Sequence, residues 1–117
     1  MAKGFQWDFA EENIILEDTN AGFKLQLIKN GGIVVHVGNI WFEVDPNDIN
    51  FVFFRQPKLF KAGSVALFDS EEDVLYYDVE GFNNPLPLIF DVKRKQKGIL
   101  NTLLSVFKGN GFDCKIG

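Results

Sequence analysis

The feature that most constrains the fold of this chain is a single change in the spacing of its apolar residues. Up to residue 91, short apolar runs are broken by turn residues at intervals of about 8–12 positions. From 93 to 107, the segment KRKQKGILNTLLSVF places its apolar residues at helical spacing, at Ile99, Leu103, Val106 and Phe107. Many short strands followed by one helix are typical of a small β-barrel or half-open sandwich with a helical lid. We therefore predict a mainly β fold of about seven antiparallel strands, capped by a lid helix over 95–108.

Alternating residues and turn residues locate the individual strands. The segment FKLQLI, at 23–28, alternates apolar and polar residues as a half-buried strand does. Asn30-Gly31 follows it, and this dipeptide between alternating apolar runs is a strong hairpin signal. The segment INFVFF, at 49–54, is apolar at nearly every position, so we expect both of its faces to be covered. The expected strands are 13–17, 23–28, 33–37, 40–44, 49–54, 64–68, 74–79 and 88–92.

The length of 117 residues indicates one domain, and no segment has the composition of a linker. We interpret residues 1–10 as an N-terminal arm because Phe5, Trp7 and Phe9 alternate along it as in a strand. Such an arm can cover an open sheet edge of its own subunit or of a neighbour. We expect self-association, because 13 phenylalanines exceed what one core of this size needs.

Composition excludes several classes of function. The net charge is -4, so we expect no nucleic-acid partner, which would require an excess of Lys and Arg. Cys114 is the only cysteine and His36 the only histidine, so neither an internal disulfide nor a Cys/His metal site is predicted, and we expect no cofactor. No secretory signal and no apolar stretch of about 18 residues is present, and we therefore expect a cytoplasmic protein.

Residues 48–67, DINFVFFRQPKLFKAGSVAL, resemble bacterial pleckstrin-homology-like domains. The likeness is a strand, then a loop with Pro and Lys, then a Gly that opens the next strand, here Ile49, Val52, Pro57 and Gly63. The resemblance implies a seven-stranded, strongly bent antiparallel barrel, capped at one end by the helix and without enzymatic activity. The first turn, Glu17-Asp18-Thr19-Asn20, departs from the phosphoinositide-binding members, because it is acidic where they carry Lys and Arg. Inositide binding at that turn is therefore not expected.

The densest basic run comprises Lys93, Arg94, Lys95 and Lys97. This run is either a solvated helix face or a docking site for an anionic lipid surface or an acidic partner. At an anionic membrane, each basic residue would contribute about 1 kcal/mol to the free energy of binding. Cations at a helix start oppose the macrodipole. Either these charges serve binding, or the helix begins after them.

Aromatic residues suggest a second candidate surface. The core of a domain this size does not need all of the aromatic side chains, so some are expected to form an exposed patch: Trp41, Phe54, and Tyr76 or Tyr77. Exposed apolar surface indicates a protein partner or self-association. Burial beneath the lid helix is the alternative for part of this set.

The remaining polar candidates have simpler structural interpretations. The acidic segments 45–48 and 69–73 lack the ligand spacing of a calcium loop and are expected to be solvated turns. His36 lies in an apolar strand, and Cys114 has no surroundings that would activate its thiol.

These patterns favour a non-catalytic interaction module that binds protein through a sheet edge or the groove beside the lid helix. The alternative is peripheral binding to anionic membrane through the basic run at 93–97. An enzyme is the third class, and no motif in the chain specifies a reaction.

Overall fold

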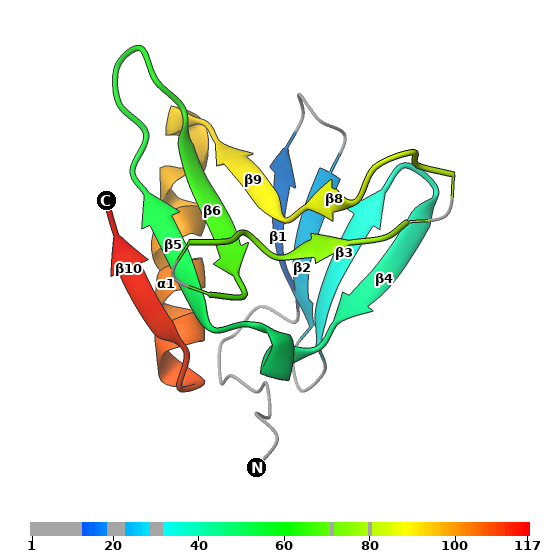
Figure 1. Ribbon diagram of the computed structural model, residues 1–117. Helices are drawn as coiled ribbons and strands as arrows, with labels where there is room; N and C mark the ends of the chain where they lie inside the picture. Colours follow the sequence, from blue (N-terminus) through cyan, green and yellow to red (C-terminus); the bar gives the residue numbers. More distant parts are fainter. Residues whose placement is uncertain (1–12, 19–22, 29–31, 71, 80) are drawn as a thin grey trace.

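The computed structural model describes residues 13–18, 23–28, 32–70, 72–79 and 81–117 (Figure 1). Within these residues the protein is mainly β, with two four-stranded sheets, a two-stranded ribbon and one α-helix near the C-terminus. The predicted fold class is therefore confirmed at the level of a mainly β fold with a C-terminal helix. The N-terminal arm at 1–10 and the turn residues Asn30 and Gly31 lie outside the described residues.

The first sheet is an antiparallel meander of four consecutive strands, β1 (Asn13–Asp18), β2 (Phe23–Ile28), β3 (Ile33–Val37) and β4 (Ile40–Val44). The alternation in β2 has the predicted result, because Leu25 and Leu27 are fully buried while Lys24 is exposed. The register places Leu27 opposite Ile33, so β2 and β3 form the expected hairpin.

The second sheet has the order β10 (Asp113–Ile116), β5 (Phe51–Arg55), β6 (Gly63–Phe68) and β9 (Ile89–Val92). The predicted coverage of both faces of β5 is confirmed, since Phe51 is 4% exposed and its neighbour Val52 is fully buried. The prediction of a purely antiparallel fold is wrong at β10, which pairs parallel to β5. After the helix the chain turns at Gly111, whose φ of 84° favours glycine, and it then enters this added strand.

The two sheets meet where β1 lies beside β9, but they do not close into a barrel. Strands β4 and β10 remain as outer edges, so of the two predicted arrangements the structure has the half-open one, and the barrel that the resemblance implied is not formed. A two-stranded ribbon is formed by β7 (Tyr76–Tyr77) and β8 (Leu86–Pro87). Its segment is hydrogen-bonded to the end of β6 through Leu75 and Leu88, and Tyr77 stacks on Phe42 of β4 at 5.1 Å. The ribbon thereby links the two sheets, with Leu75, Val79, Leu86 and Leu88 buried in the core.

The helix α1 (Lys97–Gly109) follows a short 3₁₀ turn, η2 (Arg94–Gln96), and confirms the predicted lid helix with a start at Lys97. It packs against β1, β5 and β10. Its buried face comprises Leu100, Leu103, Val106 and Phe107. Phe107 lies edge-on to Phe54 of β5 at 6.2 Å and to Phe112 at 5.4 Å, so Phe112, three residues beyond the helix, folds back on its last turn.

Candidate functional site

The basic run lies at the junction of β9, η2 and α1. Gln96 shapes this junction, because its side-chain Oε1 accepts a hydrogen bond from the Lys93 N–H at 2.9 Å and its own N–H donates to the Lys93 carbonyl at 2.8 Å. These bonds fold the run into one tight turn. Lys93 is half-buried, whereas Arg94, Lys95 and Lys97 are exposed. Since α1 begins at Lys97, three of the four cations precede the helix, and Lys97 is the one that opposes the macrodipole from within it.

A second cationic segment lies at the tip of the β5–β6 hairpin, which the sequence interpretation treated as an ordinary loop. The Lys58 N–H donates to the Lys61 carbonyl at 2.8 Å, and the Lys61 N–H donates to the Lys58 carbonyl at 3.3 Å. The turn between them consists of Leu59 and Phe60, which are 67% and 95% exposed. In Figure 1 this connection extends well beyond the end of the sheet. The signal that could have identified it is an adjacent apolar pair between two lysines, K-L-F-K.

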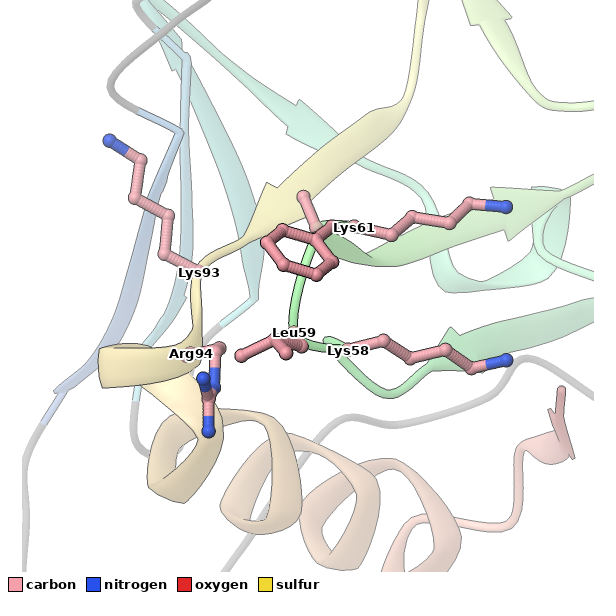
Figure 2. Close-up of a pocket in the computed structure, with 7 residues that line it drawn as sticks. Lys58, Leu59, Lys61, Lys93 and Arg94 are labelled. Carbon is pink, nitrogen blue, oxygen red and sulfur yellow. The ribbon is translucent and has the colours of Figure 1, made fainter.

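The pairing of β6 with β9 brings these two segments together. Gly63 lies opposite Val92 in an antiparallel register, so the residues before Gly63 and those after Val92 leave the sheet at the same end. The result is a surface pocket of about 250 Å³ lined by Lys58, Leu59, Phe60, Lys61, Ala62, Lys93 and Arg94 (Figure 2). We call these residues, together with Lys95 and Lys97, the cationic surface.

The charged groups of the cationic surface do not converge on one point. In Figure 2 the Lys58 and Lys61 side chains extend to one side, and Lys93 and Arg94 lie on the other, with the Leu59 side chain directed toward Arg94. The six cations, Lys58, Lys61, Lys93, Arg94, Lys95 and Lys97, are half of the 12 Lys and Arg residues of a chain whose net charge is -4. The arrangement is therefore an apolar centre with positive charge spread around it.

Three of these charges are held in positions that oppose local stability. Lys58 and Lys61 pair directly across the hairpin, where like charges destabilise a β-ladder. Lys97 opens the helix, where an anion would be favoured. Lys58, Lys61 and Lys97 thus lie against the local electrostatic preference, whereas Lys93, Arg94 and Lys95 precede the helix and do not oppose its dipole from within it.

The stem of the hairpin depends on Gly63. A Cβ atom at this position would collide with the Arg55 carbonyl oxygen and would lie 2.6 Å from the Pro57 nitrogen. We expect Gly63→Ala to lower the free energy of unfolding by about 1–3 kcal/mol, because the backbone of the opposite strand must move. Urea unfolding followed by circular dichroism measures this change.

Gly98→Ala is the matched control for that substitution. No atom lies within 4 Å of a Cβ built on Gly98, which is in the first turn of α1. Alanine there should leave stability unchanged or raise it by up to about 1 kcal/mol, because alanine is the better helix former. Equal destabilisation by the two substitutions would contradict the close packing at Gly63.

The two aromatic candidates differ in outcome. Trp41 is 62% exposed on β4, as predicted. Strand β4 lies on the opposite side of the molecule from the β5–β6 hairpin in Figure 1. Phe54 is fully buried, so its proposed place on an exposed surface is corrected. Strand alternation directs Val52 and Phe54 into the core, where Phe54 meets Phe107 beneath the helix.

The other polar candidates have structural partners. His36 Nε2 lies 2.7 Å from Gln26 Oε1 on the neighbouring strand, and the Asp45 carboxylate accepts from the Asn47 N–H at 2.9 Å. The Tyr77 hydroxyl accepts from the Asp45 N–H and donates to Asp48, and burial raises the pKa of Tyr77. Burial likewise raises the pKa of the Cys114 thiol, which disfavours its reactive thiolate form.

In the part of the chain that the structure describes, no group of three or more His, Cys, Asp or Glu side chains is placed to hold a metal ion. Within the same residues, no helix has the length and apolar character needed to cross a bilayer; α1 has 13 residues against the roughly 20 required. Comparisons with models of protein families, with curated proteins and with solved structures found no match to this chain.

Proposed function

We propose that this protein is a non-catalytic docking module that binds anionic phospholipid membranes through the cationic surface. One observation carries the proposal. The basic run at 93–97 and the Lys58–Lys61 hairpin, more than thirty positions apart in the chain, line the same pocket next to the most exposed apolar side chain of the described residues, Phe60. A bilayer with acidic headgroups matches both properties, because it offers many negative charges in one plane and apolar chains just beneath them.

The spread of the charges favours a membrane over a single small anion. Recognition of one phosphate requires donors that converge on it, whereas the Lys58 and Lys61 side chains point away from Lys93 and Arg94 (Figure 2). The pocket of about 250 Å³ is also smaller than the usual range for small-molecule sites, about 300–1,000 Å³. The exposed Leu59–Phe60 pair gives no advantage with a nucleic-acid backbone, but it does with lipid.

The fold is consistent with a more specific version of this proposal. An antiparallel meander of β1 to β4, a second sheet and a C-terminal helix suit a pleckstrin-homology-like domain that serves recognition and not catalysis. In that case the binding surface is at the β5–β6 hairpin and the start of the helix, and not at the first turn.

Protein binding at a sheet edge is the second candidate, and the exposure of Trp41 favours it. Trp41 lies on β4, the outer strand of the first sheet, whose second edge pairs with no other strand of the described residues and could take an added strand. Because β4 lies far from the hairpin tip, Trp41→Ser should leave vesicle binding unchanged if the membrane proposal is correct.

Vesicle cosedimentation tests the membrane proposal. Full-length protein should bind vesicles of phosphatidylcholine with 30% phosphatidylserine at low salt, and binding should fade as salt rises toward 0.5 M. The double variant Arg94→Ser/Lys95→Ser should bind roughly 10-fold to 30-fold more weakly, since each basic residue at an anionic surface contributes about 1 kcal/mol.

The control double variant, Lys24→Ser/Lys108→Ser, has the same net charge but removes exposed cations from β2 and from the far end of α1. It should bind within about threefold of the unmodified protein, because neither lysine lines the pocket or belongs to the basic run at 93–97. Equal losses in the two double variants, or no binding by the unmodified protein at low salt, would rule out this site.

A further inference from the structure

The tip of the β5–β6 hairpin exposes apolar surface that electrostatic docking alone does not require. Phe60 is 95% exposed and Leu59 is 67% exposed, although Phe and Leu are normally among the most buried residue types. The two residues are adjacent and form the entire turn between Lys58 and Lys61. This pair therefore forms a small exposed apolar surface at the turn of the β5–β6 hairpin, a connection that extends beyond the sheet in Figure 1.

We propose that Leu59 and Phe60 insert between the headgroups of an anionic phospholipid bilayer, as far as the boundary with the acyl chains, and so anchor the domain in a fixed orientation. This inference rests on the proposed function and adds to it how deep the protein penetrates and which way it faces. The occupant of the surface is the outer layer of a bilayer that contains phosphatidylserine.

The hydrogen bonding of the hairpin allows insertion of the turn and sets its depth. Unpaired backbone groups are strongly disfavoured among acyl chains. The two backbone hydrogen bonds between Lys58 and Lys61 satisfy the closing pair of the hairpin, so only the two turn residues advance beyond it. The turn can thus reach the headgroup boundary without carrying further unpaired backbone into the bilayer.

Lys58 and Lys61, on either side of the turn, are placed where a hairpin inserted in this way would meet the lipid headgroups. Long Lys side chains extend along apolar surface and place their ammonium groups among lipid phosphates. If Leu59 and Phe60 reach the boundary between headgroups and acyl chains, Lys58 and Lys61 lie one residue further from the bilayer centre, on the two strands of the hairpin. Lys93 and Arg94 line the same pocket and reach the headgroup layer beside them.

The stem presents the tip in a preformed conformation. Strands β5 and β6 pair up to Arg55 and Ser64, and Gly63 packs against the Arg55 carbonyl and Pro57 at the base of the loop. A preformed hairpin loses little conformational entropy when it binds. Binding therefore has two separable parts: attraction by the cations, which salt screens, and insertion of the tip, which salt leaves almost unchanged.

A fluorescent probe at Leu59 tests the insertion directly. In a Cys114→Ser background, Leu59→Cys labelled with an environment-sensitive dye should shift to shorter wavelength on vesicles with 30% phosphatidylserine, and brominated lipids should quench it. The same dye at Ser105→Cys, an exposed position two turns beyond Lys97 on α1, should show neither effect.

Phe60→Ser provides the second measurement, with melting temperature as the check that the fold is retained. We expect about tenfold weaker vesicle binding, with an unchanged slope of affinity against salt concentration, because the lost interaction is apolar. Binding without a dye shift, together with full affinity of Phe60→Ser, would overturn insertion and leave the electrostatic docking intact. Absence of vesicle binding by the unmodified protein would overturn both proposals.

Discussion

Leu103→Asp should unfold the protein or lower its free energy of unfolding by about 4 kcal/mol or more. Leu103 is fully buried on the face of α1 that packs against the sheets, so the substitution places an unpaired carboxylate in the core. Thermal unfolding followed by circular dichroism, with urea unfolding of any folded fraction, measures the loss.

Lys108→Asp is the control on the same helix. Lys108 is exposed in the last turn of α1, and reversal of its charge there changes stability by about 1 kcal/mol or less through the helix dipole. Similar melting temperatures for the two variants would show that α1 is not the lid of this core.

Phe54→Ala and Phe60→Ala make the same chemical change in opposite environments. Phe54 is fully buried against Phe107, and its truncation should destabilise the protein by about 3–5 kcal/mol through lost burial and a residual cavity. Phe60 is 95% exposed, so its truncation should change stability by less than about 0.5 kcal/mol.

Chemical denaturation of the two variants side by side measures this difference. A large loss on truncation of Phe60 would mean that the hairpin tip packs against the rest of the domain. In that event the tip would not be free to contact lipid. A negligible loss on truncation of Phe54 would contradict the packing of α1 over β5.

Much of the fold follows from local patterns that the sequence displays directly. Alternation in β2 predicted its buried Leu25 and Leu27, and helical spacing predicted α1 to within two residues of its start. Both patterns report which face of an element is apolar, and that property depends on neighbours in the chain. The doubly apolar run at 49–54 predicted a strand covered on both sides for the same reason.

The same patterns could not show which side of β5 Phe54 would occupy. In a strand that is apolar on both faces, alternation does not single out the side beneath the helix, so an exposed patch and burial under the lid both stayed open for Phe54, and the structure shows burial. Trp41, by contrast, lies on the same face of β4 as Glu43, and its exposure was predicted correctly.

By itself, the sequence determined the mainly β character of this protein, the positions of most strands, the single C-terminal helix and the basic run at 93–97. Only the tertiary structure decided that β10 pairs parallel to β5, that the β7–β8 ribbon links the two sheets and that the barrel stays open. It also decided the candidate site, because the register of Gly63 opposite Val92 brings Lys58–Lys61 beside Lys93 and Arg94. The physical reason is the range of the information: periodicity reflects neighbours within a few residues, whereas strand pairing between distant segments depends on how all the buried faces pack together.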